Sequence, residues 1–206
     1  MWSPFWKFLA RVWLRVFGWT AVVHAPLPPR FVMIAAPHTT NWDLPFMLAV
    51  AIAADVKIRW MGKHTLFGIP LLGRLLTYLG GIPVVRNERH NTTQQMIEKF
   101  RSSELMALAV QPEGTRKLVP RWRSGFYRIA HGAGVPIVPG FLDYTARVGG
   151  FGPSYLLTGD RKKDMDHLRE FYKDKRGKYP ELFGPVRLED EDLQLDSPGT
   201  GGGPED

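Results

Sequence analysis

The sequence predicts a single α/β domain with a mixed, largely parallel sheet flanked by helices. Two observations favour this class. Short apolar runs, often β-branched, alternate along the chain with stretches of helical spacing, which is typical of strands joined by helices. The length of 206 residues suits one domain with a sizeable core, and no internal repeat or linker divides it. We therefore expect one body over residues 21–188 with an appendage at each end.

Each predicted element follows from the spacing of its apolar residues. Six apolar runs are predicted as strands of one sheet: residues 31–36, 56–60, 81–85, 105–110, 135–142 and 155–158. Five segments between or after them have helical spacing: residues 42–54, 66–79, 92–101, 124–131 and 163–173.

The first 20 residues predict an amphipathic helix that lies in a membrane interface. Lys7, Arg11 and Arg15 are its only charges, and their spacing of four places them in one stripe surrounded by apolar side chains. Four of the seven tryptophans also fall here, and tryptophan favours the headgroup region. Arg11 near the centre argues against a spanning helix. A helix buried on the domain and a true span stay open as alternatives.

The other end, residues 189–206, is predicted to be an acidic disordered tail. It holds seven acids and no Lys or Arg, and its Gly/Pro-rich end has nothing to bury. Removing those seven acids raises the formal net charge from +7 to +14. The body therefore favours anionic partners such as phosphorylated small molecules, anionic lipid headgroups or nucleic acid.

The absence of cysteine narrows the chemistry. A chain with no cysteine has no disulfide, no thiolate metal ligand and no cysteine nucleophile. The sequence also lacks G-x-S-x-G, Walker A and H-E-x-x-H patterns. Its histidines show no second histidine at ligand spacing, so no metal site is predicted.

A histidine and an aspartate frame the first candidate site, His38-Thr-Thr-Asn-Trp-Asp43, which follows the predicted strand at 31–36. A loop histidine can approach an aspartate in the first turn of the next helix. The aspartate would accept from one ring nitrogen and leave the other to take a proton from a hydroxyl. The same residues also fit a capping box between Thr40 and Asp43, with His38 lining a turn.

Two further strand ends carry candidate binding residues. Arg86 ends the predicted strand at 81–85, and the planar fork of arginine suits phosphate. In Gln111-Pro-Glu-Gly-Thr-Arg116, Gly114 permits a tight turn whose amides can face an anion beside Arg116. A solvated arginine and a simple turn explain each segment equally well in isolation. Because ligands collect beyond the carboxyl ends of strands, we expect the three loops to share a cleft.

Together these segments resemble the glycerolipid acyltransferases, the lysophosphatidic acid acyltransferase family. Its pattern runs N-H-x-x-x-x-D, G-x-I-x-x-x-R, F-P-E-G-T-R and V-P-I-V-P, and the last block matches residues 135–139 here. Residues 61–73, which contain Lys63, are similar to the lysine-containing segment between the first two blocks. The resemblance covers roughly residues 30–145. Pro37 replaces the usual Asn and Gln111 the usual Phe.

The resemblance implies an acyltransferase of the 1-acylglycerol-3-phosphate type in phospholipid biosynthesis, with His38 as general base and Asp43 orienting it. It implies acyl-CoA or acyl carrier protein as co-substrate, a lysophospholipid acceptor, no further cofactor and no metal. Membrane lipids are the expected partners, and the expected location is the cytoplasmic face of a membrane. The implied substrate-binding residues are Lys63, Arg86, Glu113, Gly114, Thr115 and Arg116.

Two other functions stay open from the sequence. One is a non-catalytic peripheral protein whose basic body binds anionic lipid. The other is a metal-dependent phosphohydrolase built around His38 and Asp43. Nucleic acid is not an expected partner, because the basic residues form no known binding module.

Overall fold

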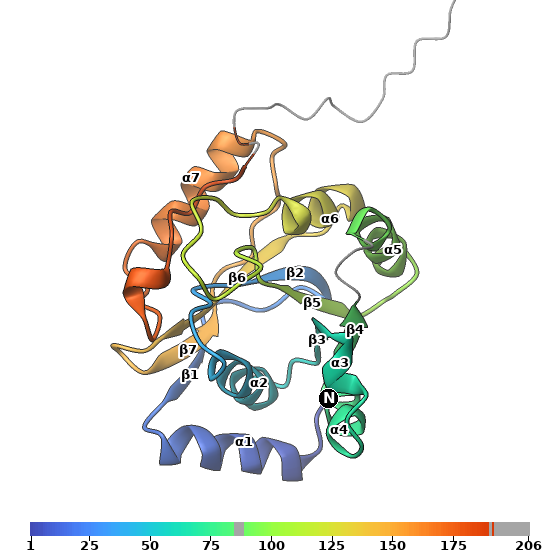
Figure 1. The fold of residues 1–206 in the computed structure, drawn as a ribbon, viewed down its shortest axis with the longest axis vertical. Helices are drawn as coiled ribbons and strands as arrows, with labels where there is room; N and C mark the ends of the chain where they lie inside the picture. The colour runs from blue at the N-terminus through green and yellow to red at the C-terminus, as the bar shows by residue number, and fades with distance from the viewer. Residues whose placement is uncertain (85–88, 190, 192–206) are drawn as a thin grey trace, which may run out of the picture.

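The computed structural model describes residues 1–84, 89–189 and 191. Within them seven strands form one sheet in the order β1-β7-β6-β2-β5-β3-β4 (Figure 1). Every neighbouring pair is parallel except β6 and β7, so the predicted mixed, largely parallel sheet is confirmed. The strands are β1 (Thr20–Val23), β2 (Arg30–Ala35), β3 (Ile58–Lys63), β4 (Gly81–Val84), β5 (Met106–Val110), β6 (Ile137–Asp143) and β7 (Val148–Phe151).

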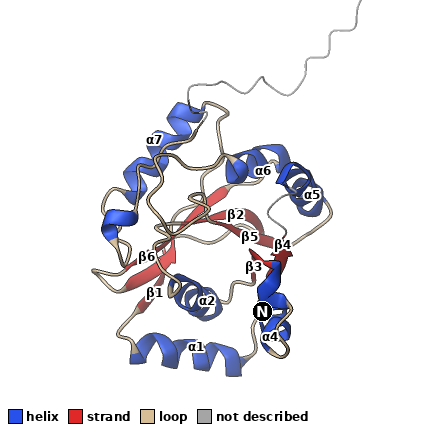
Figure 2. Ribbon diagram, viewed as in Figure 1, coloured by secondary structure: helices blue, strands red, loops and turns tan. Residues whose placement is uncertain are grey.

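Helices cover both faces of the sheet (Figure 2). Alternate residues of β2 show this, because Phe31 and Met33 pack with α1 and α2, whereas Val32 and Ile34 pack with α5, α6 and α7. Burial on both faces explains why the central strands are continuous apolar runs. The helices are α1 (Pro4–Val16), α2 (Asp43–Ala53), α3 (His64–Phe67), α4 (Leu72–Tyr78), α5 (Arg89–Arg101), α6 (Gly125–Ala133) and α7 (Arg161–Tyr172), with a 3₁₀ turn at Pro180–Leu182.

The α1 helix forms an outer layer that packs on α2 (Figure 1). Its inner face buries Ala10 and Leu14, and Lys7 pairs with Asp55 at 2.8 Å. Because Lys7 forms this ion pair, the predicted stripe of Lys7, Arg11 and Arg15 does not face solvent as a whole. The outer face carries exposed apolar side chains, with Phe8 62% and Val16 73% exposed, beside the exposed Arg11 and Arg15. No helix in the described part of the chain is long and apolar enough to cross a membrane.

Two sequence predictions on the strands are wrong. Residues 155–158 form no strand beyond a single antiparallel bridge from Tyr155 to Ile137, and the Thr158 backbone and the Tyr155 hydroxyl donate instead to the buried Asp164 carboxylate. The strands β1 and β7 were not predicted. The glycines of β7 weaken its strand signal, yet they are required there, since a Cβ on Gly150 would lie 2.2 Å from the Val22 carbonyl oxygen on β1.

The predicted helix at 66–79 is two helices. Pro70 lies in the break between α3 and α4, where it cannot donate a backbone hydrogen bond. At Gly73 an added Cβ would lie 2.1 Å from the Phe67 carbonyl oxygen, so only glycine allows α4 to pack so closely on α3.

The predicted disordered tail, residues 189–206, lies outside the described residues except for Glu189 and Glu191. For these two the expectation is wrong. The Glu189 backbone N–H donates to the Trp122 carbonyl oxygen, and the buried Glu191 carboxylate pairs with Arg169 at 2.9 Å. The packed body therefore extends past residue 188.

Candidate active site

The candidate site lies where parallel strands end together. The strands β2, β5 and β3 are neighbours with the same direction, so their carboxyl ends meet at one edge of the sheet. His38 follows β2, Glu113 follows β5 and Lys63 ends β3. The structure thus brings three of the predicted site segments to one edge, as expected for an open α/β sheet.

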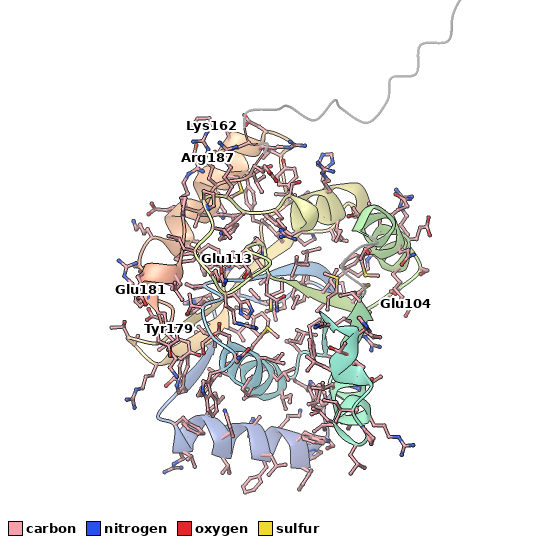
Figure 3. The ribbon with its side chains drawn as sticks, viewed as in Figure 1. Glu104, Glu113, Lys162, Tyr179, Glu181 and Arg187 are labelled. Atoms are coloured by element: carbon pink, nitrogen blue, oxygen red, sulfur yellow. The ribbon has the colours of Figure 1, made fainter. Side chains whose placement is uncertain are left out.

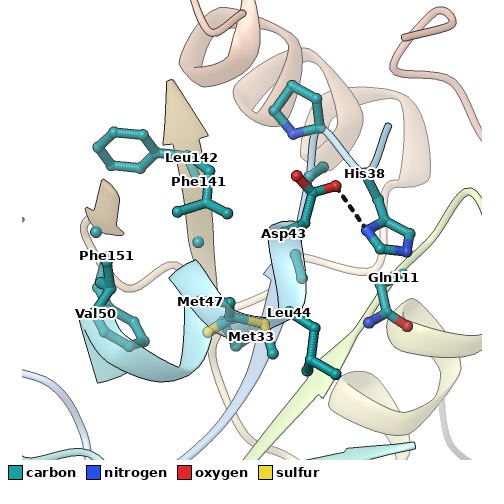
Figure 4. A pocket seen from close by; sticks show the side chains of 15 residues that line it. Met33, His38, Asp43, Leu44, Met47, Val50, Gln111, Phe141, Leu142 and Phe151 are labelled. Atoms are coloured by element: carbon teal, nitrogen blue, oxygen red, sulfur yellow. Dashed lines mark ion pairs between the residues drawn. The ribbon is translucent and has the colours of Figure 1, made fainter. Parts of the chain in front are cut away.

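The predicted pair of His38 and Asp43 is present. The Nδ1 atom of His38 lies 3.1 Å from Oδ2 of Asp43, and the histidine side chain is 15% exposed (Figure 4). This contact is possible because His38 lies in the loop after β2 while Asp43 begins α2. With Asp43 accepting from Nδ1–H, the imidazole tautomer leaves Nε2 as the basic nitrogen.

The Asp43 carboxylate also accepts hydrogen bonds from three other groups around the loop. Its Oδ2 atom accepts hydrogen bonds from the backbone N–H groups of Thr39 at 2.9 Å and Thr40 at 3.0 Å, and its Oδ1 atom accepts one from the Tyr144 hydroxyl at 2.8 Å. The bond from Thr40 is the capping contact that the spacing also allowed. One carboxylate therefore shapes the loop and contacts the histidine, although Trp42 and not Thr40 is the N-cap of α2.

Glu113 holds the same loop from the other side. The carboxylate of Glu113 accepts a hydrogen bond from the His38 backbone N–H at 3.2 Å, and the residue is only 1% exposed within the body (Figure 3). Burial raises the pKa of Glu113 to about 8, and the nearby Asp43 charge adds to this rise. Buried in this way, Glu113 cannot offer its carboxyl group to a substrate as predicted. Its geometry is that of a positioning residue.

The remaining predicted residues differ in what the structure places. Gly114 has φ +66°, and a Cβ there would lie 3.0 Å from the Arg123 guanidinium, so glycine lets Arg123 cover the turn. The Thr115 hydroxyl accepts a hydrogen bond from the Lys117 N–H, two positions later. Arg116 and Lys63 are exposed. Arg86 lies outside the described residues.

An apolar pocket opens beside His38. It lies between α2 and the sheet, has a free volume of about 30 Å³ as it stands, and includes Gln111 next to the histidine ring (Figure 4). Its wall is formed by apolar side chains from β2, α2, β6 and β7: Met33, Met47, Val50, Phe141, Leu142 and Phe151. The arrangement places the His38–Asp43 pair in the wall of a narrow, mostly apolar pocket.

Comparison with known proteins agrees with this geometry. A family model described as Acyltransferase matches residues 23–142. The chain belongs to the acyltransferase family. The crystal structure of the 1-acyl-sn-glycerophosphate (LPA) acyltransferase PlsC from Thermotoga maritima is similar to it, with 18% sequence identity and a TM-score of 0.56 over 82% of this chain and 74% of that one. At this identity the likeness shows a shared fold. No curated protein sequence matches the chain.

Parts of the acyltransferase site lie outside the family-matched residues and were not found from the sequence. Tyr144 binds Asp43 from 101 positions away, so no local spacing could have indicated it. The Tyr179 backbone N–H donates to Thr39 at 3.3 Å, and Lys178 lies 5.8 Å from the centre of the Trp42 ring. Residues 177–179 therefore close over the loop that carries the histidine.

Proposed function

We propose that this acyltransferase moves a fatty acyl group from an acyl thioester to the hydroxyl of a lysophospholipid, with His38 as general base. The observation that carries the proposal is the His38–Asp43 pair, 3.1 Å apart, at the entrance of an apolar pocket. We take 1-acylglycerol-3-phosphate as the acceptor, in keeping with the motif resemblance and with the activity that gives the Thermotoga maritima protein its name.

The proposed reaction follows from the free ring nitrogen. Nε2 of His38 removes the proton of the acceptor hydroxyl as its oxygen attacks the thioester carbonyl carbon. The C–S bond then breaks, the new ester forms, and the imidazolium returns its proton to the leaving thiolate. The buried Asp43 carboxylate stabilises the imidazolium between these two steps. General base catalysis contributes about 10²- to 10⁴-fold, and positioning supplies much of the rest.

The two ends of the substrates suit different parts of the site. The apolar side chains between α2 and the sheet suit the acyl chain of the donor. The exposed Lys63 and Arg116 stand at the same sheet edge and suit the acceptor phosphate, and we propose Arg86 for the same role. Both acyl-CoA and acyl carrier protein fit as donors.

We further propose that the protein works at the cytoplasmic face of a membrane as a peripheral protein, where the acceptor and product reside. The exposed apolar face of α1 supports this location. A helix of this kind lies in the headgroup region without spanning the bilayer.

The test is turnover of purified protein with acyl-CoA or acyl carrier protein thioester and lysophosphatidate, read as free thiol and as phosphatidate. We expect His38→Ala to lower kcat at least about 10²-fold while the melting temperature stays unchanged. Turnover retained by this variant would refute the role of His38. A metal chelator should leave turnover unchanged, whereas a metal-dependent phosphohydrolase would lose activity and release inorganic phosphate.

A further inference from the structure

The α3–α4 segment presents a second exposed apolar surface. Its inward side chains, Phe67 and Leu76, pack against the body. Its outward side chains are exposed, and at Leu71 the exposed fraction reaches 79%. The six that stand out are Leu66, Ile69, Leu71, Leu72, Leu75 and Tyr78. A cluster of this size on a single chain indicates an interaction surface.

The backbone at Leu71 supports a role for this exposure. Leu71 has φ 63° and ψ −52°, and the Leu72 N–H donates to the Pro70 carbonyl oxygen at 2.7 Å, which makes Leu71 the centre of a γ-turn. This turn is rare and strained for any residue other than glycine. Leu71 therefore combines a strained backbone with a large apolar side chain that points into water. Backbone strain of this kind is typical of functional positions.

The segment is continuous with α1. The ring of Tyr78 on α4 lies 6.0 Å from the Trp2 ring and 5.7 Å from the Trp6 ring. Both helices lie along the lower edge in Figure 1. The exposed apolar faces of α1 and of α3–α4 therefore border one another, with the aromatic cluster of Trp2, Trp6 and Tyr78 between them.

The charge of this part of the chain indicates which kind of partner suits the surface. Residues 1–84 hold eight Lys or Arg and only two acids, Asp43 and Asp55. Asp43 is buried beside His38, and Asp55 is paired with Lys7. No free carboxylate of this part of the chain opposes an anionic surface. Apolar side chains among basic ones suit a bilayer that contains anionic lipid.

We infer that the α3–α4 segment is a second membrane-docking element, which inserts its leucines beside α1 into an anionic lipid surface. The inference deepens the proposed function, because it states how the acyltransferase is held against the membrane that contains its acceptor. Vesicle binding is measured without turnover, so a failure of the proposed reaction and a failure of this surface give different results.

The first experiment is flotation with vesicles of phosphatidylcholine and phosphatidylglycerol. We expect Leu71→Glu with Leu75→Glu to lower the vesicle-bound fraction roughly tenfold or more, because two apolar contacts are replaced by charges that anionic lipid repels. The matched control is Leu105→Glu with Leu156→Glu, which changes two leucines that are 78% and 63% exposed elsewhere on the protein and should bind like the wild type. Equal binding by both double variants would overturn the inference.

A second variant separates docking from folding. Leu71→Gly removes both the side chain and the backbone strain, so we expect a melting temperature no lower than that of the wild type together with weaker vesicle binding. A lower melting temperature with unchanged vesicle binding would show that Leu71 serves the fold alone. If the surface instead pairs two copies of the chain, sedimentation would give a dimer that Leu71→Glu with Leu75→Glu dissociates, and the inference would be wrong.

Discussion

At the residue scale, the orientation of the His38 ring depends on how Asp43 is held. The Asp43 carboxylate accepts from two loop amides and from the Tyr144 hydroxyl while it faces the imidazole. Burial, followed by the adjacent Asp43 charge, raises the pKa of Tyr144 above its ordinary value, so its hydroxyl remains a donor. These donors fix the direction of the carboxylate and leave its negative charge for the imidazolium.

Replacing Tyr144 with Phe tests this arrangement. The Tyr144→Phe variant keeps the ring that packs against Trp19 and loses only the bond to Asp43. We expect kcat to fall about tenfold with little change in KM, since one supporting hydrogen bond is worth about 1 kcal/mol. Tyr179→Phe is the control, because Tyr179 touches the loop through its backbone N–H. A rise in KM at unchanged kcat would show that Tyr144 contacts a substrate instead.

Glu113 gives a prediction on stability against pH. Its pKa is raised from 4.5 to about 8 in the folded protein, so its contribution to stability is full below pH 4.5 and is lost as pH rises through 8. Glu113→Gln stays neutral and can still accept from the His38 N–H. As the pH rises from about 5 to 9, denaturation should therefore show that the free energy of unfolding of the variant increases relative to that of the wild type by up to a few kcal/mol. A constant difference across this range would mean that Glu113 is not buried as described.

At the scale of elements, the proposed function assigns the acyl chain to the space between α2 and the sheet. Val50 on α2 lines the pocket near Phe151 on β7. We expect Val50→Phe to reduce turnover of long-chain thioesters about tenfold more than that of short-chain ones. Val50→Ala should shift the preference in the opposite direction. Equal effects on all chain lengths would indicate that the acyl chain lies elsewhere.

The α7 helix holds residues 155–158 through one buried carboxylate. Burial by itself would raise the pKa of Asp164, but hydrogen bonds from Tyr127, Thr158 and Tyr155 hold this pKa below its usual range. We expect Asp164→Asn to lower the free energy of unfolding by about 3 kcal/mol at neutral pH, because buried donors lose a charged acceptor. The exposed Asp166→Asn on the same helix should change it by less than about 1 kcal/mol. Similar losses in chemical denaturation of both variants would contradict this account.

The elements that could be predicted from the sequence are those with a strong local pattern. The runs that became β2, β5 and β6 are apolar because both sheet faces are buried, and the helix at α2 follows directly from its spacing. β7 could not be predicted, because its glycines are explained only by the close approach of β1, more than 120 positions earlier in the sequence. In the sequence, Pro70 indicates the break between α3 and α4. The helical spacing of the leucines around it nevertheless led to the prediction of one continuous helix.

At the scale of the whole molecule, charge is divided unevenly between the body and the carboxyl end. Residues 192–206 contain four acids and no Lys or Arg. Deleting them raises the formal net charge from +7 to +11, so we expect tighter binding to anionic vesicles at low salt. Binding to pure phosphatidylcholine vesicles should not change. A gain that persists at high salt would refute an electrostatic origin.

The candidate site could be predicted from the sequence only in part. His38, Asp43 and Glu113 lie in short segments whose order along the chain matches a family pattern. The direction of each contact could not be predicted, and Glu113 proved to hold the His38 backbone within the body. Tyr144 and Tyr179 come from the carboxyl-terminal third, and only the folded sheet brings them to Asp43 and Thr39.

The loop around His38 is completed by residues that the ribosome makes late. Glu113, Tyr144 and Tyr179 each donate to or accept from this loop, and they follow it by 75, 101 and 140 positions. During synthesis the histidine would emerge long before its last partner. A chain that stops short of Tyr179 would already contain the family-matched stretch and still lack the contact that holds Thr39 beside His38.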